Sequence, residues 1–128
     1  MRKFLPAAVT LVLFCMALVF AACAITQTGE TTVTFSHSGK KPADGMGRES
    51  LYIEDGVERL TLSCALSLPD GEAVIEVINL NTNASLWREV FTTDAAFTIP
   101  LKNLQAGYSY DFVAHITQAT EYTLQLTY

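Results

Sequence analysis

The sequence predicts an all-β domain, an antiparallel β-sandwich of seven or eight short strands. Residues 60–68 alternate Leu or Cys with small residues over nine positions without interruption, which is typical of a strand with one buried face. Comparable runs recur at roughly ten-residue spacing after residue 30, separated by turns. No stretch after residue 24 has the periodicity of a helix. Strands of this kind bury their apolar faces by packing in two layers.

The chain opens with a secretory signal. Met1-Arg2-Lys3 is basic, and residues 4–24 are uncharged and mostly apolar, as in the n-region and h-region of a signal peptide. The h-region ends in Ala21-Ala22-Cys23, which resembles the lipobox of bacterial lipoproteins, with Phe20 at the position that is usually leucine. This resemblance implies a signal peptide over residues 1–22, cleavage before Cys23 and a diacyl lipid, palmitate-like in its chains, on the Cys23 sulfur.

Two alternatives to the lipoprotein stay open. Ala22-Cys23-Ala24 also fits the small-x-small pattern of ordinary signal peptidase, which would release a soluble secreted protein. An uncleaved segment of roughly twenty apolar residues could instead form an N-terminal transmembrane anchor. All three alternatives place the folded part outside the cytoplasm.

Composition limits what the mature chain can be. Residues 23–128 are enough for one domain, with a short polar tether at 23–30 and the sandwich at 31–128. Removing Arg2 and Lys3 leaves six basic against thirteen acidic residues, so the net charge changes from −5 to −7. An acidic domain argues against nucleic acid as a partner. Cys64 has no second thiol besides Cys23 and lies on the leucine face, so it predicts a small buried hydrophobe.

The first half of the domain is expected to hold strands at residues 31–36, 51–54 and 57–68. Residues 37–50 are rich in Gly, Ser, Lys and Pro, and a segment of that length and composition predicts a long mobile loop. Asp55-Gly56 is a hairpin signal between two extended runs.

The second half predicts strands at residues 73–80, 84–91, 95–101, 108–114 and 121–128. The run 73–80 is apolar at nearly every position, which indicates a strand that is covered on both faces or lies near the centre of its sheet. Residues 84–91 carry large apolar groups on both parities, as an edge strand with a bulge would. Pro100 places its strand at an edge or ends it, because proline has no N–H to donate.

Leu104, Gly107 and Tyr110 have the Leu-x-x-Gly-x-x-Tyr spacing that resembles the tyrosine corner of immunoglobulin-like and fibronectin-like sandwiches. The resemblance implies a Greek-key, immunoglobulin-like topology, with a jelly roll as the alternative. It also implies a buried Tyr110 whose hydroxyl bonds to backbone between residues 101 and 107. The anchor, tether and small sandwich together are similar to bacterial surface lipoproteins and to accessory sandwich domains attached to secreted peptidases.

The sequence contains no pattern that predicts a catalytic, cofactor-binding or metal site. His37 and His115 lie far apart in the chain, and no Asp-x-Asp-x-Asp loop for calcium is present. Trp87, Tyr52 and Tyr108 could together form a flat aromatic surface for sugar rings, although packing in the core explains such residues more simply.

We therefore expect a non-enzymatic binding or structural module of the cell envelope, anchored to the extracytoplasmic face of the membrane through Cys23. Its expected partner is an envelope protein or a carbohydrate, and no cofactor is predicted. The alternative is a small extracytoplasmic enzyme or enzyme inhibitor that uses the 37–50 loop, since this loop carries His37. The position of His37 relative to carboxylates and to a pocket discriminates between the two.

Overall fold

The structure is a computed structural model that describes Gln27 and residues 31–128. The predicted signal peptide, Cys23 and the rest of the tether lie outside the described residues. The described chain contains six strands: β1 (Thr32–Ser50), β2 (Leu60–Ser67), β3 (Glu72–Asn79), β4 (Ala84–Phe91), β5 (Ala95–Leu101) and β6 (Tyr110–Thr127). All strand pairs are antiparallel, so the predicted all-β antiparallel class is confirmed. Over residues 27 and 31–128, no helix has the length and apolarity needed to span a bilayer.

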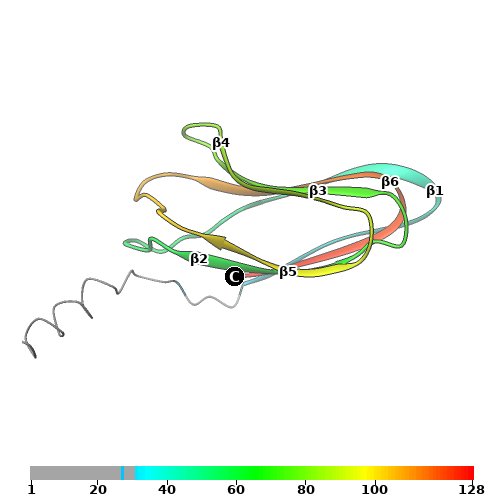
Figure 1. Ribbon diagram of the computed structural model, residues 1–128, viewed down its shortest axis with the longest axis horizontal. Coiled ribbons are helices and arrows are strands. Elements are labelled where there is room, and N and C mark those ends of the chain that lie inside the picture. The colour runs from blue at the N-terminus through cyan, green and yellow to red at the C-terminus, as the bar shows by residue number, and fades with distance from the viewer. Residues whose placement is uncertain (1–26, 28–30) are drawn as a thin grey trace, which may run out of the picture.

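Strands β1 and β6 are 19 and 18 residues long and take part in both layers of the sandwich. Residues 110–117 of β6 pair with β3, and residues 123–127 pair with β2. β1 follows β6 along nearly all of its length. One layer therefore has the order β4-β3-β6-β1 and the other has the order β5-β2-β6-β1, and each long strand bends from one layer into the other (Figure 1).

The chain forms four long antiparallel paths, and each of them passes from one layer of the sandwich into the other. They are β1, β6, β2 continued by β3, and β4 continued by β5. Folding each path once gives four strand segments in each layer, which is the jelly-roll arrangement of eight segments. Of the two topologies that the sequence left open, the pairing order is that of the jelly roll. Seven of the eight predicted strand positions fall within the six strands, with 108–114 and 121–128 both in β6, and the eighth, 51–54, does not.

The four paths all bend at the same end of the molecule, seen at the right of Figure 1. Neighbouring bends are joined by hydrogen bonds from a backbone N–H to an aspartate carboxylate: Gln118 donates to Asp44 (2.9 Å), Thr120 to Asp70 (3.0 Å) and Leu68 to Asp94 (2.6 Å). A carboxylate is a strong acceptor for a backbone donor that the sheet leaves unpaired. We call this end, with its three aspartates, the bend end.

Gly71 makes the crossing from β2 to β3 sterically feasible. Its φ is +84°, a left-handed conformation that glycine adopts without strain. A Cβ at this position would lie 2.6 Å from the carbonyl oxygen of Thr117. The bend therefore brings two backbones closer together than any side chain would allow.

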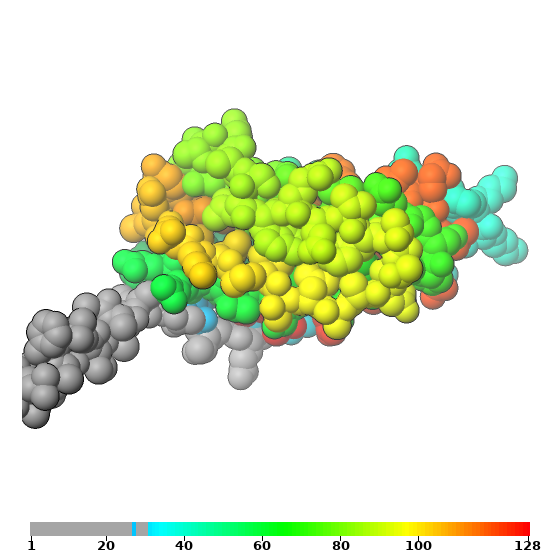
Figure 2. Space-filling view, in the orientation of Figure 1, coloured from blue at the N-terminus to red at the C-terminus, as the bar shows by residue number. Residues whose placement is uncertain are grey.

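The core fills the space between the inner faces of the two layers. Strand β2 alternates buried and exposed residues along its whole length, as predicted, and Cys64 is among the buried ones. Aromatic pairs bridge the layers: Phe35 stacks on Phe112 at 6.3 Å between ring centroids, and Phe97 stacks on Trp87 at 5.7 Å. β4 and β5, yellow-green to yellow, lie together on the near side of the molecule in Figure 2. Between these two strands Phe97 also stacks on Phe91, with 4.5 Å between ring centroids.

Two local predictions are wrong. Residues 37–50 are not a loop but the greater part of β1, paired to β6 with register shifts between Ser38 and Gly45. The sequence there shows no alternation because most of its side chains are exposed, so β6 rather than a buried face imposes the extended form. Residues 51–54 form no strand. They run beside β6, where the Leu51 N–H donates to the Tyr110 carbonyl (2.9 Å).

Candidate functional site

The outer faces of the two layers differ sharply in chemistry. The outer face of the β5-β2-β6-β1 layer, here the β2–β5 face, carries mostly small uncharged residues: Thr32, Thr34, Ser36, Ser38, Thr61, Ser63, Ala65, Ser67, Ala96, Thr98, Pro100, Thr123, Gln125 and Thr127, with Glu121 beside the bend end. The outer face of the other layer, here the β3–β4 face, mixes large apolar and charged residues: Met46, Arg48, Val74, Glu76, Ile78, Leu86, Arg88, Val90, Asp111, Val113 and His115.

Large apolar side chains stand on the solvent side of the β3–β4 face. Met46 is 55% exposed, Val90 45% and Leu86 36%, while Val74 and Ile78 of β3 are half-buried beside them. β4 is an edge strand with a register shift next to Val77, as its sequence predicts. Val90 adjoins Val74, and Leu86 lies next to Ile78 at the register shift, whereas Met46 lies on the far strand of the layer, with His115 between it and Val74. Several large apolar side chains exposed on one face favour an interaction site over a solvated surface.

Ion pairs flank the apolar side chains on the same face. The Arg48 guanidinium lies 2.6 Å from Asp111, whose side chain is only 3% exposed. The second carboxylate oxygen of Asp111 is buried and accepts no hydrogen bond from any described residue. Arg88 lies 3.9 Å from Glu76, and both of these side chains are partly exposed. The face therefore combines exposed apolar side chains on β1 and β4 with charges of both signs, and its central row holds Arg48, Glu76 and Arg88 around the buried Val113.

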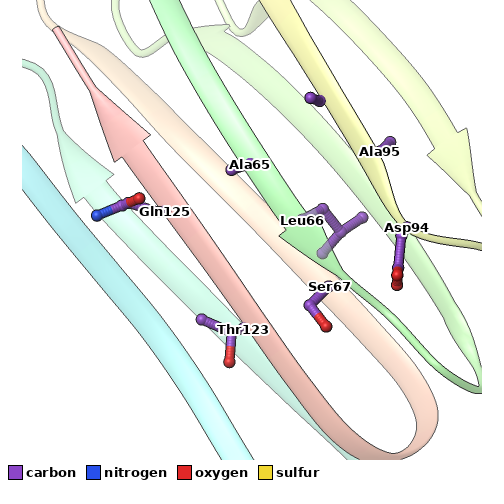
Figure 3. Close-up of a pocket in the computed structure, with 8 residues that line it drawn as sticks. Ala65, Leu66, Ser67, Asp94, Ala95, Thr123 and Gln125 are labelled. Carbon is purple, nitrogen blue, oxygen red and sulfur yellow. The ribbon is translucent and has the colours of Figure 1, made fainter.

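The β2–β5 face contains a shallow open hollow of ≈ 470 Å³ (Figure 3). Ala65 and Ala96 line it where the side chains of neighbouring strands are smallest, and Ser67, Thr123 and Gln125 supply hydroxyl and amide groups around them. Its lining has no histidine or cysteine. The Asp94 carboxylate also lines the hollow, and its Oδ1 accepts the Leu68 N–H. These groups can hydrogen-bond a ligand, and the lining has no imidazole or thiol for nucleophilic catalysis.

The three aromatic residues considered for sugar binding do not come together. Trp87 points inward from β4, is half-buried and stacks on Phe97 with an interplanar angle of 6°. Tyr52 and Tyr108 are exposed on turns at the opposite end from the bends. Trp87 is kept away from the two tyrosines because alternate side chains of β4 point between the layers and Trp87 is one of these.

Tyr110 lies where the corner resemblance places it. It is the first residue of β6, is 3% exposed, and its hydroxyl accepts a hydrogen bond from the Gln105 N–H at 3.0 Å. Leu104 is buried, and its N–H donates to the Glu58 carbonyl at 3.0 Å. Gly107 has a φ of +80° and open space around its Cβ position. This contact therefore occurs in a jelly roll and does not require the immunoglobulin order of strands.

The remaining chemically active residues are dispersed. His37 is exposed on β1 with its ring 6.1 Å from that of Tyr122, and no hydrogen bond or ion pair of the described chain joins it to a carboxylate. His115 faces solvent, as expected. Burial raises the pKa of the Cys64 thiol to about 12, which keeps it protonated and unreactive. Among the described residues, no three His, Cys, Asp or Glu side chains are grouped to hold a metal ion.

Sequence reasoning did not single out the β3–β4 face as a site. The signal was nevertheless present in residues 73–80, which are apolar on both parities, and again in residues 84–91. The inner parity of β3 is fully buried, whereas the outer parity is only half-buried. A strand with the composition of a doubly covered strand is therefore covered on one side alone.

No family model and no curated protein matches the sequence. The solved structures with distant similarity to the chain include the following two. One is a chain of a glycosylation associate protein complex from Streptococcus agalactiae, with a TM-score of 0.36, 19% identity, and 78% of this chain aligned to 37% of that one, so the present chain spans about a third of its length. The other is a disulfide-linked pilus protein of Bacillus endospore appendages, with a TM-score of 0.35, 14% identity, and 84% of this chain aligned to 94% of that one. Likenesses at this level carry no argument about function.

Proposed function

We propose that this chain is a membrane-anchored binding module of the cell envelope, held at the extracytoplasmic face by a lipid on Cys23 and acting without catalysis. Its partner is an envelope protein that packs against the β3–β4 face. The observation that carries this proposal is the exposure of Met46, Leu86 and Val90 on one outer face, opposite a face built of small polar residues.

The composition of the β3–β4 face favours a protein partner. Protein interfaces are enriched in Met and Arg and depleted in Lys, with an apolar centre and a polar rim. The face has one Met, two Arg and no Lys. It also contains no Trp, Tyr or Phe, the side chains on which sugar rings usually stack. A protein therefore fits this surface better than a carbohydrate.

The enzyme alternative loses its sequence support in the structure. It depended on a mobile glycine-rich loop around His37, and that segment is strand β1 with His37 exposed on it. Support for the anchor comes from the sequence, through Ala21-Ala22-Cys23 at the end of the h-region.

Metabolic labelling tests the anchor. A palmitate analogue should mark the protein in cells, and Cys23→Ala should abolish the mark. Labelling that persists in Cys23→Ala would reject the lipid on Cys23.

Site-specific photocrosslinking tests the binding face. A photoreactive amino acid at Val90 should give a discrete crosslinked protein species in intact cells, whereas the same group at Thr98 on the β2–β5 face should not. The triple variant Met46→Ser, Leu86→Ser, Val90→Ser should lose pull-down of the crosslinked species. Equal crosslinking at both positions, or none at Val90, would contradict a partner on the β3–β4 face.

A further inference from the structure

The end of the molecule opposite the bends is formed by three turns, at residues 51–59, 80–83 and 102–109. Hydrogen bonds tie these turns to one another. The Leu104 N–H donates to the Glu58 carbonyl (3.0 Å), the Leu80 N–H to the Ser109 carbonyl (2.8 Å), and the Ser109 N–H to the Asn81 side chain (2.8 Å). The three turns therefore form one connected surface, here the turn end, at the left of Figure 1.

Each turn presents one large hydrophobic side chain to solvent. Tyr52 is 68% exposed, Leu80 40% and Tyr108 39%. Tyr52 is held firmly on both sides, because its N–H donates to the Tyr128 hydroxyl (3.1 Å) and its carbonyl accepts from the Gln27 amide (3.0 Å). A rigid backbone that displays an exposed aromatic ring is unusual for a solvated turn and typical of a contact surface.

Gln27 fixes the start of the domain at this same end. Its side chain accepts a hydrogen bond from the Glu54 N–H (2.7 Å) as well as donating to Tyr52, and its own N–H approaches the Arg59 carbonyl (3.4 Å). Gln27 is 9% exposed. Gln27, near the midpoint of the predicted tether at residues 23–30, is therefore attached to the 51–59 turn.

The reach of the remaining tether is short. Gln27 lies four positions after Cys23 in the sequence, and a fully extended chain over four positions spans at most about 14 Å. If the segment 4–24 stayed uncleaved in the bilayer, the reach from its end would be shorter still. In contrast, β3 alone has eight residues, so the bend end lies roughly 25 Å beyond the turn end.

We propose that the turn end rests on the membrane to which the chain is anchored, with Tyr52, Leu80 and Tyr108 seated in the lipid headgroup layer. The inference rests on the proposed membrane anchor. Tyrosine is enriched at membrane–water interfaces because its ring is apolar and its hydroxyl is polar. The three turns hold Glu54, Asp55 and Glu58 against Arg59 and Lys102, a net charge of −1, so hydrophobic contact rather than attraction to anionic lipid holds the surface in place.

This orientation has a consequence for the proposed binding face. When the turn end lies on the bilayer, the strands stand away from the membrane, and the β3–β4 face is presented sideways. A partner on that face would be an envelope protein that is itself close to the membrane surface.

Depth-dependent quenching tests the orientation. Protein extracted from membranes would carry a fluorophore on Lys102→Cys at the turn end or on Lys41→Cys at the bend end, two exposed lysine positions. Cys64 is buried and is not labelled in the folded protein. After reconstitution into phosphatidylcholine vesicles that contain a headgroup nitroxide lipid, the probe at residue 102 should be strongly quenched and the probe at residue 41 should not.

A matched pair of triple variants locates the contact. Tyr52→Ser, Leu80→Ser and Tyr108→Ser together should remove most of the quenching at residue 102. Met46→Ser, Leu86→Ser and Val90→Ser together, which change the same number of exposed apolar residues on the β3–β4 face, should leave it unchanged. Circular dichroism confirms that each variant is folded.

The outcomes separate this inference from the proposed function. Protein that is membrane-bound but quenched equally at both probes, or more at residue 41, overturns the orientation and leaves the anchor intact. Protein that stays in solution overturns both. If quenching at residue 102 persists in the turn-end triple variant, then Tyr52, Leu80 and Tyr108 are not the side chains that hold the turn end in the headgroup layer.

Discussion

A single hydroxyl group ties the 102–109 turn to the first residue of β6. The Tyr110 hydroxyl accepts a hydrogen bond from the Gln105 N–H at 3.0 Å, and the ring beneath it is buried. Tyr110→Phe keeps the ring and leaves the N–H without its acceptor, so it should lower the free energy of unfolding by about 1–2 kcal/mol. Denaturant midpoints measure this loss.

Tyr108→Phe is the control for that measurement, since Tyr108 is 39% exposed and its hydroxyl has no hydrogen bond to another described residue. Its effect should stay within about 0.5 kcal/mol. Equal losses in the two variants would mean that the Tyr110 hydroxyl contributes nothing specific to the corner.

Asp70 makes the stability of the bend end dependent on pH. The hydroxyl and then the N–H of Thr120 donate to its carboxylate and hold its pKa below the ordinary value of 3.8. A pKa that is lower in the folded state than in the unfolded state stabilises the fold above the unfolded pKa, and this contribution disappears as pH falls through the folded pKa. Wild-type protein should therefore exceed Asp70→Asn in stability at neutral pH.

The advantage of wild type over Asp70→Asn should shrink as the pH is lowered to about 2. Thermal midpoints at several pH values measure it. Asp55→Asn removes the same charge from an exposed turn residue and serves as the control. A gap between wild type and Asp70→Asn that is independent of pH would show that the ionised form of Asp70 is not the stabilising species.

At the scale of elements, burial decides which strands the sequence could predict. β2 and β5 were predicted because their alternation records one buried face, whereas β3 and β4 were predicted from apolar residues on both parities. All of β3, β4 and β5 were placed to within about one residue. The 37–50 part of β1 was missed because its partner β6, and not its own pattern, holds it extended. Composition also does not predict that β6 continues without a break through Gln118, which has a φ of 55°.

The crossings between layers can be tested with two glycines of similar backbone conformation. Gly71 has a φ of +84° and Gly107 a φ of +80°. Alanine at either position therefore lowers the free energy of unfolding by about 1–2 kcal/mol, because it must adopt a left-handed backbone conformation. At Gly71 the new Cβ would also lie 2.6 Å from the Thr117 carbonyl oxygen, whereas at Gly107 it meets nothing within 4 Å.

Gly71→Ala should therefore destabilise the protein by at least about 2 kcal/mol more than Gly107→Ala, because the backbone of the β2–β3 crossing must shift. Urea midpoints of the two variants give the difference. Similar losses in both would indicate that the crossing at Gly71 has room to relax and is not closely packed against β6.

At the scale of the whole molecule, the sequence predicted the class but not the folding of the sheet. Seven of the eight strand segments were recognised, and the second half of β1 was not. The pairing of distant segments depends on contacts that no local pattern encodes, and the bend end joins Asp44, Asp70 and Asp94 from three separate crossings. The sequence indicates the candidate face only through residues 73–80, which are apolar on both parities. Its exposure became visible once β3 was placed in a layer whose outer side no other strand of residues 31–128 covers.

The folded-over sheet makes a further prediction about cooperativity. Because β1 and β6 belong to both layers, neither layer can unfold and leave the other with its pairing intact. Unfolding should be a single two-state transition. Trp87, the one tryptophan of the chain, reports on the β4–β5 side through its stacking on Phe97, while far-ultraviolet circular dichroism reports on all strands. The urea midpoints from the two signals should coincide, and a Trp87 transition at clearly lower urea would show that the β4–β5 side opens independently of the long strands.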